Sequence, residues 1–297
     1  MAVISPILSQ FSDALSALAS GARGFTAGVR TESGQYLSGV LWKPNAIVMS
    51  EQSLPDSAEY EVRVADESAR ATLAGRDQGT NVAVLKLEKD LPTALPGFAE
   101  AKTGALALVL GATTESVSAC LAIVRSIGGA WESVAGGTID RRIVLDTIIR
   151  SEEGGPVLAP DGNILGISTH GVRRQALVIP ASTVDKAVGV LLEKGTVERG
   201  WLGVALRPVA LPESLRPDAG QRVGLMVMEV AGDSPAQKEG IAAGDIILSA
   251  GGIAVSRFGH LTRQLGSGSI GKNIELRLAH AGAVVSKNVT IEAKKPA

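Results

Sequence analysis

Short apolar runs separated by turn residues are the main pattern in the first two thirds of the chain. Between Gly24 and Leu87, apolar and polar residues tend to alternate within each run. A period of two is typical of half-buried β-strands, and runs at this spacing favour a β-barrel or sandwich over alternating strands and helices. The expected strands are Phe25–Val29, Ser38–Trp42, Ala46–Met49, Tyr60–Val64, Ala71–Ala74 and Val82–Leu87, and later Ala105–Gly111, Val117–Ile127, Ile139–Ile149 and Val157–Thr169.

Two segments have the period of a helix instead. An amphipathic helix is expected to begin with Ser5 as its cap and to end at Gly21, with its apolar face docked on its own domain. A second helix is expected to begin with Ser182 or Thr183 as its cap and to end at Gly195.

Composition and charge narrow the class of protein. The chain has 297 residues, of which 45% are hydrophobic and 20% charged, so it is long enough for two domains with their own cores. Aromatic residues make up only 3%, whereas there are 35 glycines, which indicates aliphatic cores joined by many turns. The net charge of −1 gives no reason to expect nucleic acid or an anionic membrane as a partner.

Metal and disulfide chemistry is not indicated by the sequence. The single cysteine, Cys120, excludes an intramolecular disulfide, and the three histidines, His170, His260 and His280, are too dispersed for a metal site. No cofactor is therefore expected. The first residues lack the pattern of a secretory signal, and no apolar run reaches the roughly 20 residues of a membrane span. The expected location is therefore the cytoplasm, with the periplasm as the alternative if a signal peptide has been removed.

A glycine-rich turn provides the first resemblance to a known family. Glu153-Gly154-Gly155-Pro156, followed by an apolar strand, an Asp161-Gly162 turn and a second apolar strand, resembles the active-site hairpin of chymotrypsin-like serine proteases of the HtrA/Deg family. In that family the residue before Gly-Gly-Pro is the nucleophilic serine. The resemblance puts Glu153 at that position.

Two earlier segments resemble the same family. Ile47–Leu54 aligns with the strand that ends in the family's catalytic histidine, which puts Gln52 at that position. Gly75–Leu87 aligns with the segment that carries the catalytic aspartate, which puts Asn81 there. The resemblance therefore implies that all three triad positions are replaced.

These replacements predict a protein that does not cleave peptides. Gln52 cannot accept a proton near neutral pH, Asn81 cannot stabilise an imidazolium by charge, and a glutamate is a poor nucleophile towards amides. The chain is therefore expected to be no enzyme but an inactive adaptor, chaperone-like factor or accessory subunit. The alternative is a peptidase with another nucleophile, Ser151 or Ser50, which the absence of any histidine before residue 170 disfavours.

Two carboxylates precede the Gly-Gly-Pro turn. Adjacent residues on an extended chain point apart, so Glu152 and Glu153 are not expected to form an acid/base pair. One hypothesis is that the Glu153 carboxylate occupies the remnant oxyanion hole and accepts the N–H groups of its own loop. The loop Asp146–Glu153 is also one residue shorter than the family's usual loop. His170, which follows an apolar strand, is poorly placed as a general base.

The last third of the chain resembles a PDZ domain of the HtrA type. Its loop Gly200–Val204 matches the segment that offers N–H groups to a peptide's C-terminal carboxylate, with Gly224–Val230 as the strand beside the groove and Val255–Leu265 as the groove helix. A PDZ groove adds the peptide as a further strand. The expected binding residues are Trp201, Leu202, Gly203 and Val204 for the carboxylate and Met226, Met228, Leu261 and Leu265 for the pocket.

The two resemblances together define the expected architecture. The chain is expected to be mainly β, with a chymotrypsin-like double β-barrel over residues 1–198 followed by a C-terminal α+β PDZ domain over residues 199–297. The expected partner is a polypeptide, bound through a hydrophobic C-terminus or as a subunit of an enzyme complex. The resemblance also implies a homotrimer that assembles through the N-terminal segment.

A glycine-rich segment in the last third almost matches a phosphate-binding loop. Gly266–Asn273 reads Gly-Ser-Gly-Ser-Ile-Gly-Lys-Asn, but the final Ser or Thr of the motif is Asn273, and the segment leads into a strand. The sequence therefore predicts a turn at this place.

Overall fold

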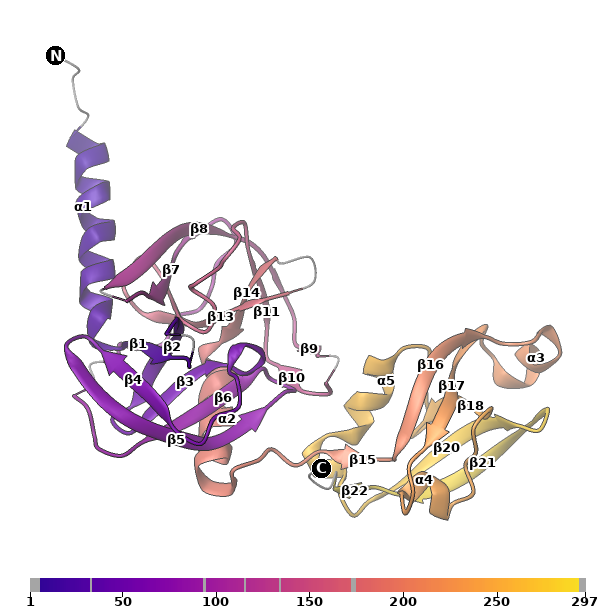
Figure 1. Cartoon of the computed structure of the whole chain (residues 1–297). Coiled ribbons are helices and arrows are strands. Elements are labelled where there is room, and N and C mark those ends of the chain that lie inside the picture. Colours follow the sequence, from indigo (N-terminus) through magenta and orange to yellow (C-terminus); the bar gives the residue numbers. More distant parts are fainter. Residues whose placement is uncertain are drawn as a thin grey trace. The chain divides into compact units, whose positions relative to one another are not determined.

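The computed structural model describes residues 6–32, 34–92, 95–114, 116–133, 135–171 and 175–293. The chain divides into two compact units (Figure 1), each with its own buried cluster of aliphatic side chains. The first unit comprises Met1–Trp131 and Ile139–Val197, and the second comprises Glu132–Thr138 and Glu198–Ala297. None of the helices in the described part of the chain combines the length and the apolarity that a membrane crossing requires.

The first unit contains two closed antiparallel β-barrels. The first barrel has the strand order β1-β2-β3-β6-β5-β4 and the second has the order β11-β14-β13-β12-β7-β8. The first barrel consists of β1 (Thr26–Arg30), β2 (Tyr36–Lys43), β3 (Ala46–Ser50), β4 (Tyr60–Val64), β5 (Glu67–Asp77) and β6 (Val82–Leu87). The second consists of β7 (Leu106–Ala112), β8 (Val117–Gly128), β11 (Arg142–Leu145), β12 (Pro156–Leu158), β13 (Ile164–His170) and β14 (Ala176–Pro180), and a separate pair of strands is formed by β9 (Trp131–Glu132) and β10 (Thr138–Ile139).

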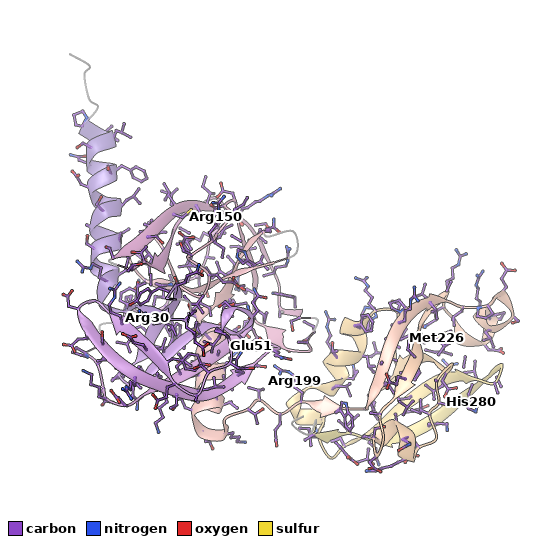
Figure 2. The ribbon with its side chains drawn as sticks, viewed as in Figure 1. Arg30, Glu51, Arg150, Arg199, Met226 and His280 are labelled. Atoms are coloured by element: carbon purple, nitrogen blue, oxygen red, sulfur yellow. The ribbon has the colours of Figure 1, made fainter. Side chains whose placement is uncertain are left out.

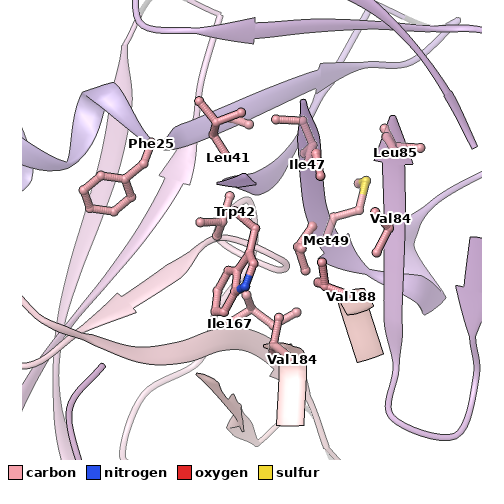
Figure 3. Close-up of a cluster of buried hydrophobic side chains, with 14 of the residues drawn as sticks. Phe25, Leu41, Trp42, Ile47, Met49, Val84, Leu85, Ile167, Val184 and Val188 are labelled. Carbon is pink, nitrogen blue, oxygen red and sulfur yellow. The ribbon is translucent and has the colours of Figure 1, made fainter. Parts of the chain in front are cut away.

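The burial of these strands follows their sequence pattern. Every residue of β3 is buried, as its continuous apolar run predicts, whereas β4 alternates because Glu61 is exposed between the buried Tyr60 and Val62. Side chains from different strands and from one helix fill a single core cluster, as Figure 3 shows for Met49, Val84 and Val188. Strand alternation thus places one face of each barrel strand in an aliphatic interior.

Two longer helices belong to the first unit. Helix α1 (Pro6–Gly21) has the predicted length, and the expected cap Ser5 lies outside the described residues. Leu15, Leu18 and Ala19 pack on the core of the unit, so the C-terminal half of α1 docks on its own domain as expected. A short 3-10 turn, η1 (Ala22–Gly24), connects α1 to β1, and a second, η2 (Glu51–Ser53), follows β3.

Helix α2 (Ala181–Lys194) ends as predicted, because Gly195 adopts the left-handed conformation with φ 72°. Its predicted cap is wrong. Pro180 occupies the N-cap position without a side-chain cap, and Ser182 and Thr183 lie inside the helix. Both hydroxyls instead bind Asp140: Ser182 donates to its carboxylate and Thr183 accepts its backbone N–H.

The second unit is an antiparallel sheet with short helices. Its sheet has the order β16-β17-β18-β20-β21, with β19 paired to β18, and a separate pair is formed by β15 and β22. The strands are β15 (Gly200–Trp201), β16 (Val204–Ala210), β17 (Val223–Val230), β18 (Ile246–Ala250), β19 (Ile253–Ala254), β20 (Asn273–His280), β21 (Ala283–Thr290) and β22 (Glu292–Ala293). The helices are α3 (Arg216–Ala219), α4 (Pro235–Lys238) and α5 (Phe258–Thr262), with 3-10 turns η4 (Glu213–Leu215), η5 (Arg263–Leu265) and η6 (Ser267–Ser269).

Candidate functional site

Three separate elements of the first unit bring together the residues that the sequence singled out. Gln52 lies on η2, directly after β3, and Asn81 lies in the turn between β5 and β6 with φ 56°. Glu153 precedes β12. The backbone N–H of Gln52 donates to Asn81 Oδ1 at 2.9 Å, and Gln52 Nε2 donates to Glu153 Oε1 at 2.5 Å. The three positions therefore form one connected site.

A glycine allows the Glu153 loop to approach the first barrel. Gly154 has φ 87°, and a Cβ at this position would lie 2.4 Å from the carbonyl oxygen of Ser38 and 2.9 Å from the backbone nitrogen of Ser50. Only glycine tolerates both this conformation and this contact. The Gly-Gly-Pro turn thus holds the Glu153 backbone against β2 and β3.

The Glu153 carboxylate is the centre of the site. Its Oε1 accepts hydrogen bonds from Ser50 Oγ at 3.0 Å and from Gln52 Nε2, while its Oε2 lies 3.2 Å from His170 Nε2. The carboxylate side chain is 15% exposed. A hydroxyl and an imidazole therefore contact the two oxygens of one carboxylate.

The hydroxyls of Ser50 and Thr169 hold the amides of the site in place. Asn81 Nδ2 donates to Ser50 Oγ at 3.0 Å and to Thr169 Oγ1 at 2.6 Å. Thr169 Oγ1 also accepts from Gln52 Nε2 at 3.0 Å. Ser50 Oγ can thus donate its proton to Glu153 while it accepts a hydrogen bond from Asn81.

His170 has one partnered and one unpartnered ring nitrogen. Nε2 faces Glu153, whereas Nδ1 is buried and has no hydrogen-bond partner among the described residues. A hydrogen bond to the Glu153 carboxylate, which only accepts, requires that Nε2 carries a proton. The expectation that His170 takes no part in the site needs correction, because the end of β13 places it against Glu153.

The neighbouring carboxylate points elsewhere. Glu152 Oε2 accepts the backbone N–H of Arg150 at 2.9 Å, and its Oε1 accepts hydrogen bonds from Ser118 Oγ at 3.1 Å and Ser151 Oγ at 3.3 Å. Burial favours the neutral form of Glu152, but these hydrogen bonds, with that of its own backbone N–H, outweigh it and hold the pKa below its usual value. Glu152 and Glu153 do point apart, as their adjacent positions predict.

The hypothesis that Glu153 fills a remnant oxyanion hole is not supported. The hydrogen-bond donors that reach its carboxylate in the described part of the chain are side chains, not N–H groups of its own loop. The residue that accepts a loop N–H is Glu152. The sequence predicted that a carboxylate would bind this loop, but it assigned the wrong one of two adjacent residues.

The predicted carboxylate loop of the second unit has its N–H groups on one side. The carbonyl oxygens of Leu202 and Gly203 accept hydrogen bonds from the N–H groups of Ala236 and Ala231. Because the peptide unit is planar and trans, the N–H groups of Gly203 and Val204 point to the opposite side. Gly203 has φ 78°, and a Cβ there would lie 2.1 Å from Ser234 Cβ, so this turn also requires glycine.

The strand predicted beside the peptide groove is wrong. β17 pairs with β16 on one side and with β18 on the other, so its backbone is not available to a peptide. Within the described sheet, β16 is the end strand, and it follows the carboxylate loop directly. The outer edge of β16 therefore has no strand partner in the described sheet, which is what strand addition requires.

The residues predicted to form one pocket do not lie together. Leu261 is buried and Leu265 half-buried in the cluster that contains Leu202, Leu225 and Val227. Met226, labelled in Figure 2, packs in a different cluster with Leu211 and Leu248 because alternate residues of β17 face opposite sides of the sheet. Met228 is 50% exposed, and the groove helix is shorter than predicted, with α5 limited to Phe258–Thr262.

Comparisons with known proteins define the class of protein. A family model of the trypsin-like peptidase domain matches residues 37–167, and a model of the PDZ domain matches residues 200–291. The chain is therefore a trypsin-like peptidase domain joined to a PDZ domain. This combination is similar to that of the HtrA/DegP-type proteases, and the predicted fold class is confirmed.

Curated bacterial proteins are similar to this chain over most of its length. A probable periplasmic serine endoprotease DegP-like from Pseudomonas savastanoi pv. phaseolicola is 32% identical over 97% of this chain and 62% of its own length. A protein with the same description from Halomonas elongata is 29% identical over 86% of this chain and 55% of its own length. The chain thus spans between about half and three fifths of the length of the curated relatives it matches.

Solved structures share the fold. The HtrA-type protease AlgW with decapeptide has a TM-score of 0.73 at 22% identity and covers 95% of this chain and 99% of its own. The serine endoprotease from Yersinia pestis has a TM-score of 0.72 at 22% identity over 95% of this chain and 98% of its own.

These comparisons correct two predictions from the sequence. The expectation of an inactive, non-enzymatic adaptor, chaperone-like factor or accessory subunit is contradicted because the relatives are named as serine endoproteases. The cytoplasmic location is contradicted because the relatives are named as periplasmic. The first prediction assumed that peptide cleavage requires the standard triad, and it overlooked how Ser50, Glu153 and His170 come together in the folded chain.

Proposed function

We propose that this chain is a periplasmic serine endopeptidase of the HtrA type with an altered catalytic centre. Ser50 is the nucleophile, the Glu153 carboxylate is its general base, and His170 positions that carboxylate. The observation that carries the proposal is the hydrogen-bonded series from Ser50 Oγ through Glu153 to His170 Nε2. The names of the curated relatives support the reaction class.

The roles follow from the donors and acceptors of the site. As Ser50 Oγ forms a bond with the scissile carbonyl carbon, its proton passes to Glu153 Oε1. Asn81 Nδ2 stabilises the negative charge that develops on Ser50 Oγ. When the peptide C–N bond breaks, Glu153 returns the proton to the leaving amine, and water then hydrolyses the Ser50 ester with Glu153 again as the base.

Ser50 is a better candidate than Ser151, the other serine that the sequence offered. Ser151 Oγ donates to Glu152. Burial raises the pKa of Glu152, but hydrogen bonds to its carboxylate lower it by more, so the pKa lies below its usual value and this carboxylate is a weak base.

Access to Ser50 requires a movement of Gln52. Ser50 is fully buried, and Gln52 Nε2 donates to the same carboxylate oxygen that receives the Ser50 proton. Productive binding of a polypeptide therefore requires that the exposed Gln52 side chain moves away from Glu153.

Casein hydrolysis by the purified chain tests this assignment. Ser50→Ala and Glu153→Gln are both expected to reduce kcat/KM at least about a hundredfold, because each removes a partner of the proton transfer. Ser151→Ala serves as the matched control and is expected to retain activity. Equal activity of wild type and Ser50→Ala, or no hydrolysis by wild type, would refute the assignment of Ser50.

We also infer that the second unit binds the C-terminus of a polypeptide along β16. The N–H groups of Gly203 and Val204 would hold the terminal carboxylate, and the half-buried Leu265 side chain would contact an apolar last residue. Leu261, which is only 3% exposed, would support that pocket from the core. The support is the orientation of the loop N–H groups and the end position of β16 in the described sheet.

Leu202 is only 2% exposed, so a substitution there would test folding and not binding. The ligand is the better variable. A peptide with a hydrophobic last residue and a free carboxylate is expected to bind at least about tenfold more tightly than the same peptide with an amidated end. Equal affinities of the two peptides, measured by fluorescence anisotropy on the full chain, would contradict carboxylate capture.

We further infer that α1 mediates self-association into a homotrimer. Ile7, Leu8 and Phe11 in its N-terminal half are 76%, 65% and 39% exposed. They lie on the same apolar face of the helix as Leu15 and Leu18, which pack on the core. Three large apolar side chains on one exposed half-helix form a surface that association would bury.

A further inference from the structure

A hollow of about 410 Å³ lies in the second unit beside the glycine-rich segment that follows η5. Its volume is within the range of small-molecule sites. The residues that matter for its chemistry are Arg263, Gly266, Gly268, Lys272, Asn273 and Glu275. The sequence predicted only a turn at this place.

The charges around the hollow favour an anion. Arg263 and Lys272 are both exposed, and neither has an ion-pair partner among the described residues. The carboxylate that also lines the hollow, Glu275, accepts a hydrogen bond from Ser286 Oγ at 2.9 Å. Two cations against one carboxylate leave a net positive charge, which attracts an anion at close range.

The fold does not explain why Gly266 and Gly268 are glycines. Neither has a positive φ, and a Cβ at either position would meet no atom within 4 Å. Both nevertheless line the hollow. Their lack of a side chain leaves the backbone open to a bound group, which is how glycine-rich loops approach phosphates.

An amide at the rim adds a donor. Asn273 Oδ1 accepts a hydrogen bond from Thr290 Oγ1 at 2.7 Å. This contact uses the carbonyl oxygen of the amide and leaves the two hydrogens of Nδ2 for another acceptor.

We propose that this hollow binds the phosphate group of a small phosphate monoester. Arg263 and Lys272 neutralise its charge, the open backbone at Gly266 and Gly268 admits its oxygens, and the remaining volume holds the organic part of the ester. The site uses neither the Ser50 centre nor the backbone edge of β16.

Titration of the full chain with phenyl phosphate, followed by amide NMR, tests the charge requirement. Saturable shifts are expected at the amides of Gly266 and Gly268, with inorganic phosphate binding more weakly and acetate more weakly still. Arg263→Gln and Lys272→Gln are each expected to weaken phenyl phosphate binding about tenfold or more, as loss of a charged hydrogen bond does. Arg257→Gln, an exposed arginine at the start of α5 that does not line the hollow, is the control and should bind as wild type does.

A glycine pair tests the open backbone without a change of charge. Gly268→Ala and Gly259→Ala both add a methyl group where no atom lies within 4 Å, but only Gly268 lines the hollow. Both variants are expected to keep wild-type stability, and only Gly268→Ala is expected to lose affinity for phenyl phosphate. Shifts that do not saturate, equal binding of acetate, or unchanged affinity in Arg263→Gln and Lys272→Gln would each overturn the proposal.

Discussion

At the scale of single residues, two adjacent carboxylates have different roles because their surroundings differ. Glu152 accepts hydrogen bonds from the backbone N–H of Arg150 and from the hydroxyls of Ser118, on β8 of the second barrel, and Ser151. Glu153 meets the side chains of Ser50, Gln52 and His170. The first carboxylate therefore stabilises the loop, and the second is the one that can exchange a proton with a hydroxyl.

The lowered pKa of Glu152 predicts an acid-sensitive loop. A carboxyl whose pKa is lower in the folded than in the unfolded state stabilises the fold above its unfolded value of about 4.3, and this contribution disappears as the pH falls through the folded value. The free energy of unfolding of wild type should therefore fall more steeply below about pH 5 than that of Glu152→Gln.

Urea denaturation at pH 7 and near pH 3.5 measures this difference. Glu152→Gln should be less stable than wild type at pH 7, and the two should converge in acid. Glu193→Gln, at an exposed position of α2, is a matched control and should leave the pH dependence of stability as in wild type. A constant stability difference between wild type and Glu152→Gln at both pH values would disprove the role of this ionisation.

The sequence predicted some of these residues and missed others. Gln52, Asn81 and Glu153 could be grouped because each belongs to a local motif that resembles a family segment. His170 and Thr169 could not, because they reach the site through the pairing of β13 with β12 and β14, which no local pattern specifies. The one signal was the polar run Ser168-Thr169-His170 at the end of an otherwise apolar strand.

At the scale of elements, the pattern of burial explains why β17 was mistaken for the strand beside the groove. An interior strand is apolar over most of its length, and β17 is the more apolar of the two candidates. The end strand β16 is largely exposed and contains Pro208, which is typical of sheet edges. The strand proposed to receive the peptide is therefore the less hydrophobic one, which apolar runs alone do not reveal.

Substitution by alanine should change the free energy of unfolding in opposite directions at two glycines, one just before β12 and one in α2. A Cβ on Gly155 would lie 2.0 Å from the carbonyl oxygen of Leu110, whereas one on Gly189, in the exposed part of α2, would meet nothing within 4 Å. Gly155→Ala should lower the free energy of unfolding by about 1–3 kcal/mol through overpacking, and Gly189→Ala should raise it by about 0.5–1 kcal/mol through helix propensity. Urea denaturation of both variants checks this, and a stable Gly155→Ala protein would contradict the close backbone contact.

The exposed half of α1 gives a second prediction at this scale. Wild type is expected to sediment as a trimer, and the double variant Leu8→Glu, Phe11→Glu should sediment as a monomer because two charges would have to be buried on association. Ser12→Glu adds a charge at an exposed polar position of the same helix and should leave the trimer intact. A monomeric wild type, or a trimeric double variant, would show that α1 does not drive assembly.

At the scale of the whole molecule, hydrophobic periodicity predicted a β-barrel or sandwich because the first unit is built from strands with turn residues between them. The family resemblance added the double barrel and the order of the two domains. Neither could supply the proposed chemistry, which depends on contacts of β3 with the loop before β12, about a hundred residues later in the chain, and of that loop with β13. The proposed catalytic centre therefore depends on the fold and not on any one motif.

The most direct test of the central claim is labelling of the full chain with a fluorophosphonate probe, followed by mass spectrometry of the modified peptide. The account predicts a single adduct on Ser50 that is absent from Ser50→Ala, reduced in Glu153→Gln and unchanged in Ser151→Ala. A chain that takes up no probe, or takes it up at another serine, would contradict it.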